Sequence, residues 1–241
     1  MGIFFDLHNH MLFGVDDGAQ TREMMHAMLD MSYSDGVRAI CLTPHFSPYL
    51  FGDTSAHSRE VFCQLEEYAA LKYPDMKLFL GHELGYYHGC EARLRSGRCR
   101  TLAGSRYVLV DFPAHAEFFE IQQAMNRMRA EGFCTVLAHA ERYRSIATQF
   151  EWIKDYVAGG GLIQINASSI CGRRFSSTRA MCTRLLREDL VHVIASDGHN
   201  LDARPPIMSV CMDYLSKHLS KQKIEELTWE NAWRIVENKN V

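Results

Sequence analysis

Seven apolar segments of strand length alternate along the chain with amphipathic segments of helical length, and this alternation constrains the fold more than any other feature. It is the pattern of repeated βα units built around parallel strands. We expect the strands at residues 2–9, 38–43, 77–82, 107–112, 134–139, 162–166 and 192–196. We expect the helices at residues 21–35, 58–71, 117–131, 146–158, 178–188 and 206–219.

The same alternation predicts a barrel in a single domain over residues 1–241. Neither a long Ser/Pro/Gly linker nor a repeat of fixed period interrupts the sequence. An open doubly wound sheet is the alternative, but such a sheet places its ligand near one switch point between strands. Here polar residues follow almost every strand. Glycines at 36, 132 and 159–161 stand just past three of the helices, where a left-handed terminating residue is expected.

Charge and cysteine usage exclude several classes of function. With 29 acidic and 26 basic residues, the net charge is −3, which leaves no basic excess for nucleic acid or anionic lipid. No apolar run reaches the roughly 20 residues that cross a bilayer, and Asp6 interrupts any signal-peptide core, so we expect a cytoplasmic protein without membrane insertion. The eight cysteines form no C-x-x-C motif and are expected to be reduced, mostly buried thiols.

Histidines and carboxylates follow six of the seven strands. His8 and His10 end the first strand and, because side chains alternate, project to one side. Asp197 and His199 repeat this spacing after the last strand. Since all strands of a parallel barrel end at one mouth, these groups should meet there. The predicted cluster has five imidazoles and four carboxylates: His8, His10, His45, His139, His199, Asp17, Glu83, Asp111 and Asp197.

Four carboxylates in one place repel one another unless cations lie between them, so the cluster predicts bound metal. Mixed imidazole and carboxylate ligands suit Mn, Fe or Zn, and nine ligands can serve about three divalent ions. Three divalent ions carry a charge of about +6 and the four carboxylates carry −4. The remaining charge of about +2 matches a phosphate monoester dianion. Arg142 and Arg204 stand close to ligands in the sequence and could orient the phosphate in bidentate fashion.

Some neighbouring residues have alternative roles. Either Asp16 or Asp17 could be the ligand, while the other caps the helix at 21–35. His82 adjoins Glu83 and should face the opposite way, so it is left outside the cluster. Isolated histidines are assigned to ordinary structure, and the tryptophans to packing. The arginines from 93 to 100 form a basic run that is expected to be solvated, although at the barrel mouth it could attract an acidic peptide.

Together these motifs resemble the PHP (polymerase and histidinol phosphatase) superfamily, and closely its bacterial CpsB-type protein-tyrosine phosphatases, over nearly the whole chain. The segments that carry the resemblance are Asp6-Leu7-His8-Asn9-His10, Val15-Asp16-Asp17-Gly18, Gly36-Val37, Thr43-Pro44-His45, Glu83 with Tyr86-Tyr87, Ser105-Arg106-Tyr107, Ala138-His139, Glu141-Arg142-Tyr143, Gln164-Ile165-Asn166, Ala195-Ser196-Asp197-Gly198-His199-Asn200 and Arg204-Pro205-Pro206.

The resemblance implies a distorted (β/α)7 barrel of the α/β class, with a trinuclear site, often filled by manganese, at the C-terminal strand ends. It favours Asp17 over Asp16. The ligand sets that it implies are His8, His10, Glu83 and Asp197 for one ion, Glu83, Asp111 and His139 for a second, and Asp17, His45 and His199 for a third. The chain departs from the family pattern at Ala140 and at Asp111, where Glu is more usual and Asp retracts the carboxylate by roughly 1.5 Å.

The implied activity is hydrolysis of phosphotyrosine on the tail of a bacterial tyrosine kinase that controls capsular or exopolysaccharide synthesis. One alternative keeps the site and changes the substrate to histidinol phosphate or a nucleotide. Another is an inactive, metal-bound scaffold, which is less favoured because no cluster position is apolar. No cysteine lies in a C-x5-R motif, so a thiol nucleophile is not expected. The sequence leaves the oligomeric state open.

Overall fold

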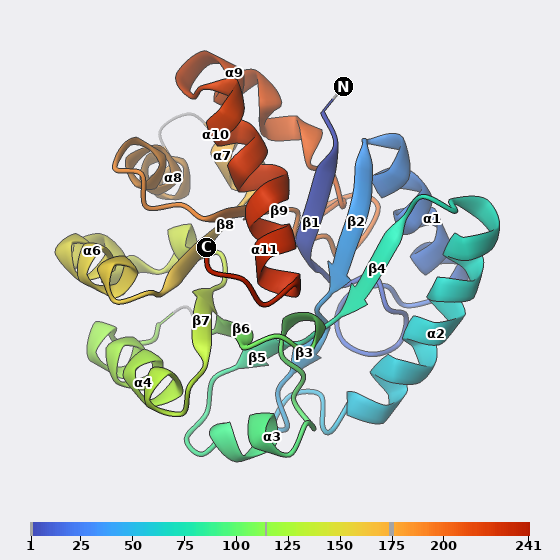
Figure 1. Ribbon diagram of the computed structural model, residues 1–241, viewed down its shortest axis with the longest axis horizontal. Helices are drawn as coiled ribbons and strands as arrows, with labels where there is room; N and C mark the ends of the chain where they lie inside the picture. Colours follow the sequence, from blue (N-terminus) through green and yellow to red (C-terminus); the bar gives the residue numbers. More distant parts are fainter. Residues whose placement is uncertain (1, 114, 174–175) are drawn as a thin grey trace.

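The computed structural model describes residues 2–113, 115–173 and 176–241. Parallel strands curl into a ring, and most of the helices lie outside it (Figure 1). One sheet has the order β1 (Phe4–Asn9), β2 (Val37–Leu42) and β4 (Lys77–Leu80). The other has the order β3 (His45–Phe46), β5 (Glu83–Gly85), β6 (Tyr107–Asp111), β7 (Cys134–Leu137), β8 (Leu162–Asn166) and β9 (Val193–Ala195).

Two strand paths pass from one sheet into the other. The predicted second strand continues through Pro44 into β3, and the predicted third strand continues through Gly81 into β5. The prediction of one strand over residues 77–82 is therefore wrong at its end, because β4 stops at Leu80 and a separate strand, β5, begins at Glu83. Pro44 has no N–H to donate to a ladder, and a Cβ at Gly81 would lie only 3.2 Å from the Cα of Leu102. At both points one strand ends and the next pairs in the other sheet.

The ring closes between β9 and β1. Asn9 and Gly198 form a parallel bridge. The Asp197 N–H donates to the carbonyl of His8 at 3.0 Å, and the His10 N–H donates to the carbonyl of Gly198 at 2.9 Å. The predicted α/β barrel of parallel strands is confirmed, with the first and last strands joined beside the two predicted histidine motifs.

Most of the predicted helices are present. Four of them lie within about three residues of the expected bounds: α1 (Arg22–Ser34), α2 (Ser55–Lys72), α4 (Phe118–Ala130) and α8 (Ser177–Arg187). The segment expected at 146–158 is divided into α5 (Arg144–Thr148) and α6 (Phe150–Ala158), and 206–219 is helical only from η3 (Ser209–Cys211) into α9 (Met212–His218). Gly36, Gly132 and Gly160 have φ values of 102°, 87° and 87°, which confirms their place at helix ends.

Short helical elements were not expected from the sequence. They are α3 (Glu91–Arg95), η1 (Leu102–Gly104), η2 (Ala140–Arg142), α7 (Ala167–Ile170), and the C-terminal run of α10 (Lys221–Glu225), the π-helical turn η4 (Glu226–Glu230) and α11 (Asn231–Val236). No helix in the described ranges is both long and apolar enough to cross a membrane.

An apolar core fills the barrel below the C-terminal strand ends. Phe5 of β1 packs between Phe79 and Trp233, with ring centroids 5.6 and 5.2 Å apart. The run from η4 to α11 lies across the ring (Figure 1) and adds Trp229 and Ile235 to this core. The N-terminal end of the barrel is thus closed by apolar side chains, and polar groups gather at the other end.

Candidate metal centre

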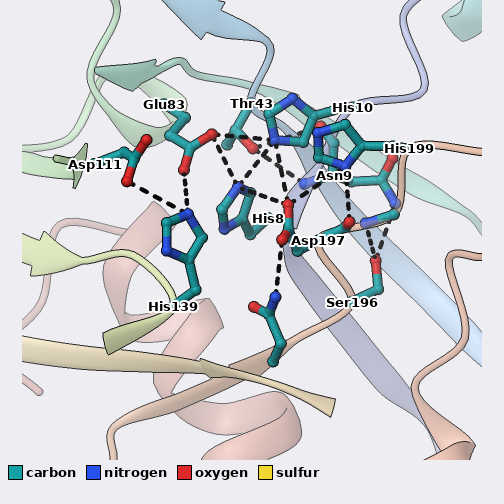
Figure 2. Close-up of polar contacts among 12 residues, drawn as sticks. His8, Asn9, His10, Thr43, Glu83, Asp111, His139, Ser196, Asp197 and His199 are labelled. Atoms are coloured by element: carbon teal, nitrogen blue, oxygen red, sulfur yellow. Dashed lines mark hydrogen bonds and ion pairs between the residues drawn. The ribbon is translucent and has the colours of Figure 1, made fainter. Parts of the chain in front are cut away.

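The structure brings all nine predicted side chains together at the C-terminal ends of the strands. His8, His10, Glu83 and Asp197 point toward one another from three different strand ends (Figure 2). The Nε2 atoms of His8 and His10 are 2.9 Å apart. The Nε2 atom of His8 lies 3.5 Å from Oδ1 of Asp197. His8 and His10, spaced by two at the end of the first strand, therefore meet Asp197 from the end of the last strand.

Glu83 occupies the middle of the cluster. Its Oε2 atom lies 3.3 Å from Nε2 of both His8 and His10, and 2.9 Å from Nδ1 of His45. Its Oε1 atom lies 3.0 Å from Nε2 of His139. The two carboxylate oxygens thus face different sets of imidazoles, which is the arrangement of a carboxylate that can bridge two ions.

Three groups of these side chains are compact enough to hold an ion. In each group, one ligand atom per residue lies within 4.8 Å of all the others. The groups are His8, His10 and Asp197; Glu83, Asp111 and His139; and His10, Asp17, His45 and His199.

Unpartnered buried atoms test whether the cluster fits metal. Oε2 of Glu83 and Nε2 of His199 are buried, and although other cluster atoms lie within 3.5 Å of them, neither has a hydrogen bond of normal geometry. Buried polar atoms are almost always paired in folded proteins. Both atoms belong to chemical types that divalent Mn, Fe and Zn bind, so the residues present fit a multinuclear metal site.

The electrostatics of the cluster favour added positive charge. Burial opposes a charged imidazole, but the Asp16 carboxylate outweighs it and raises the pKa of His10 to about 9. Burial likewise opposes charge on His45, but the carboxylates of Glu83 and Asp17 raise its pKa to about 11. Without cations, His10 and His45 therefore take up protons as counter-charges. Metal binding would displace those protons.

Asp16 and Asp17 have separate places. Asp17 lies at the exposed edge of the cluster, with Oδ1 3.4 Å from Nε2 of His45 and 3.5 Å from Nε2 of His199. Asp16 lies behind it, where Oδ2 accepts hydrogen bonds of 2.8 Å from Nδ1 of His10 and from the backbone N–H of His45. The expectation that one aspartate caps α1 is wrong, because the cap is Thr21, whose Oγ1 accepts from the Met24 N–H.

Strand β8 supplies a polar chain whose contacts the sequence did not reveal. Oε1 of Gln164 accepts hydrogen bonds from Nδ1 of His8 at 3.1 Å and from the His139 N–H at 2.7 Å. Its Nε2 donates to Asn166, and Nδ2 of Asn166 donates to Oδ2 of Asp197 at 2.8 Å. The sequence feature that could have indicated this role is the spacing of Gln164 and Asn166, which are two residues apart on an apolar strand, as His8 and His10 are. These amides orient cluster residues from beneath.

Both predicted arginines lie at the mouth of the cluster. Nη2 of Arg142 is 2.8 Å from Oδ2 of Asp197, and Nη2 of Arg204 is 3.1 Å from Oδ2 of Asp17. They line a cavity of about 300 Å³ above the cluster. The cavity wall also includes Phe112, Pro113 and Tyr143.

Residues left outside the cluster have other partners. His82 is buried, and its Nδ1 accepts the backbone N–H of Arg100 at 2.8 Å. Within the basic run, Arg95 and Arg98 are exposed, but Arg100 is half-buried and donates to the carbonyl of Ser55. The eight cysteines are free thiols, mostly buried, as expected.

Known proteins share this chain's sequence and architecture. Residues 4–237 match the family model described as "Capsular polysaccharide synthesis, CpsB/CapC". The chain is 32% identical over 236 residues to tyrosine-protein phosphatase CpsB of Streptococcus pneumoniae, covering 96% of this chain and 97% of that protein. It is 30% identical over 238 residues to CpsB of Streptococcus agalactiae serotype III, covering 97% and 98%.

A solved structure agrees with the sequence matches. It comes from work on YwqE from Bacillus subtilis and CpsB from Streptococcus pneumoniae, described as unique metal-dependent tyrosine phosphatases. It superposes with a TM-score of 0.88 and 27% identity, covering 98% of this chain and 96% of that one. The sequence matches and this superposition agree with the cluster geometry: the chain belongs to the CpsB/CapC family.

Proposed function

We propose that this protein is a metal-dependent protein-tyrosine phosphatase of capsular or exopolysaccharide synthesis. The observation that carries the proposal is the convergence of five imidazoles and four carboxylates beneath a cavity flanked by Arg142 and Arg204. The names of the relatives support it, because CpsB of two streptococci is a tyrosine-protein phosphatase and the matching solved structure is of metal-dependent enzymes.

The nine cluster residues would hold three divalent ions, with manganese as the first candidate and iron or zinc as the alternatives. We assign His8, His10, Glu83 and Asp197 to one ion. Glu83, Asp111 and His139 would hold a second, and Asp17, His45 and His199 a third. Support comes from the two oxygens of Glu83, which face different imidazoles, and from the buried atoms of Glu83 and His199 that lack a hydrogen bond of normal geometry.

Divalent ions bound here would acidify a water and withdraw charge from the phosphoryl oxygens. Arg142 and Arg204 would bind the remaining phosphoryl oxygens. Each guanidinium now pairs with a cluster carboxylate. Once cations neutralise Asp197 and Asp17, both guanidiniums can turn toward the cavity without leaving a buried charge unpaired. Phosphate binding by the two arginines would therefore depend on whether metal ions occupy the cluster.

The leaving group in this proposal is tyrosinate. A phenol has a pKa near 10, so its departure needs less protonation than that of a serine alkoxide. Phe112, Pro113 and Tyr143 give the cavity an apolar wall beside the arginines, which suits an aryl ring. We propose the tyrosine-bearing tail of a bacterial tyrosine kinase as the protein substrate.

The test compares three substrates in the presence of Mn²⁺: a phosphotyrosyl peptide, p-nitrophenyl phosphate and histidinol phosphate. The proposal expects hydrolysis of the two aryl phosphates and little of histidinol phosphate. Preference for histidinol phosphate would indicate a small-molecule phosphoesterase, and no hydrolysis of any would indicate a scaffold. As a control, thiol alkylation should leave the rate unchanged, because the cluster contains no cysteine.

A further inference from the structure

A second and larger cavity adjoins the metal centre. Its volume is about 800 Å³, which is in the range of ligand-binding pockets. Arg142 and Tyr143 line both this cavity and the smaller one above the cluster. The two cavities are therefore neighbours, with the phosphate-binding Arg142 of the proposed function between them. We call the larger one the flanking cavity.

The wall of the flanking cavity is rich in groups that hydrogen-bond. It is formed by the turn from η2 into α5, the residues before α4, and the start of α8. Hydroxyls come from Ser145 and Thr148 on one side and from Ser177 and Thr178 on the other. Such a wall suits a chain of amide groups better than an apolar ligand.

One buried group of the wall has an unsatisfied atom. Glu141 is 4% exposed, and its Oε2 atom has no hydrogen-bond partner. Its Oε1 atom accepts the Asn166 N–H at 3.3 Å. Glu141 therefore belongs to the buried part of the flanking cavity wall.

We propose that the flanking cavity binds the polypeptide on one side of the phosphotyrosine. This inference rests on the proposed function and deepens it, because it assigns a protein substrate to the site. A small phosphoester would fill only the 300 Å³ cavity above the cluster and leave the flanking cavity unused. A phosphotyrosine whose phosphate lies at Arg142 has its main chain at the rim, beside the hydroxyl-lined wall.

A third cavity, of about 410 Å³, shares Phe112 and Pro113 with the cavity above the cluster, and His115 and Ala116 with the flanking cavity. Gln123 and Arg127 of α4 line it. It does not include Arg142, and it is about half the volume of the flanking cavity. We therefore place the peptide in the flanking cavity and use the third cavity as the matched comparison.

The experiment fills each cavity with an indole. Ala147 is exposed in the last turn of α5 and lines the flanking cavity, so Ala147→Trp adds bulk without removing a hydrogen bond. Gln123→Trp places the same ring in the third cavity from an exposed position on α4. The full-length Mn²⁺-loaded enzyme is assayed on p-nitrophenyl phosphate, free phosphotyrosine and phosphotyrosyl peptides extended on either side.

In the wild-type enzyme, kcat/KM should rise about tenfold from free phosphotyrosine to the peptide extended on the favoured side, as one or two added hydrogen bonds allow. Ala147→Trp should abolish this rise and leave p-nitrophenyl phosphate turnover unchanged, which also shows that the variant is folded. Gln123→Trp should retain the rise. Ser177→Trp, from the facing wall at α8, should reproduce Ala147→Trp.

Other results overturn the inference. A wild-type enzyme that hydrolyses peptide and free phosphotyrosine equally well would exclude a peptide subsite. Loss of the rise in Gln123→Trp but not in Ala147→Trp would move the peptide to the third cavity. Failure of the wild type to hydrolyse any aryl phosphate would instead refute the proposed function, and this outcome is distinct from both.

Discussion

The phenol of Tyr143 donates a hydrogen bond of 2.6 Å to Oδ1 of Asp111, one of the four carboxylates of the cluster. The same oxygen accepts the Phe112 N–H at 2.7 Å. Burial and the adjacent carboxylate raise the pKa of the Tyr143 phenol well above its ordinary value, so the phenol keeps its proton and donates it. Tyr143 thus holds in place the Asp111 oxygen that lies 3.6 Å from Nε2 of His139.

Replacement of this phenol should weaken metal binding. In Tyr143→Phe, the affinity for one ion per chain should fall by about tenfold, the lower end of the effect of removing a group that orients a ligand. Asp111→Glu in the same background should restore binding, because the longer carboxylate reaches further without the tether. Titration calorimetry with Mn²⁺ measures both. If Asp111→Glu gives no recovery, Tyr143 has only a packing role.

Asp16 should act in the same way on the other side of the cluster. Asp16→Asn keeps the size of the side chain but loses the charge that holds Nδ1 of His10 and the amide of His45. We expect Mn²⁺ affinity to fall by about 10- to 100-fold. Gln20→Ala is the control, because Gln20 donates only to backbone carbonyls of the same loop. Equal affinity for Asp16→Asn and wild type would show that Asp16 does not orient the ligands.

The two arginines should matter for turnover and not for metal content. Arg142→Ala and Arg204→Ala should each lower kcat/KM for p-nitrophenyl phosphate by about 10²-fold, the loss typical of one donor to a charged transition state. Arg144→Ala, two residues from Arg142 and exposed, should keep the rate with this small substrate. Metal analysis of each variant separates the two effects. Loss of ions in parallel with the rate would assign the arginines to the cluster itself.

His82 should make the fold sensitive to acid. Burial lowers the pKa of His82 to about 3, while an exposed histidine titrates near 6.5. Below pH 6.5 the unfolded chain therefore binds a proton that the folded chain does not, and stability falls as pH decreases toward 3. At pH 5 this contribution is about 2 kcal/mol.

His82→Asn keeps an acceptor for the Arg100 N–H and removes the titration. In denaturant unfolding of metal-free protein, the wild type should lose more stability between pH 7 and pH 5 than this variant does. The exposed His57→Asn is the control and should follow the wild type. Parallel pH curves for wild type and His82→Asn would disprove this role.

The sequence predicted the arrangement of the cluster because two geometric rules act over any sequence separation. Alternation along β1 places His8 and His10 on one side, and a parallel barrel collects all strand ends at one mouth. Glu83 and Asp197 therefore meet, although 114 residues separate them (197 minus 83). Neither rule depends on side-chain contacts, so both can be applied to a sequence alone.

Features that depend on tertiary contacts were harder to predict. The breaks at Pro44 and Gly81 depend on which sheet each strand segment pairs with, and the sequence does not specify this pairing. Gln164 and Asn166 are neutral amides, and their role is visible only once His8 and Asp197 are placed against them. The C-terminal helical run did carry a signal: buried residues recur every three or four positions at Ile224, Leu227, Thr228, Ala232 and Ile235.

The most direct test of the central claim is the metal content of the purified enzyme, measured by mass spectrometry alongside its phosphotyrosyl peptide hydrolysis, before and after chelation. We expect about three divalent ions per chain, loss of hydrolysis when they are removed, and recovery on addition of Mn²⁺. A chain that binds no divalent ions, or that hydrolyses the peptide at its full rate after complete metal removal, would contradict it.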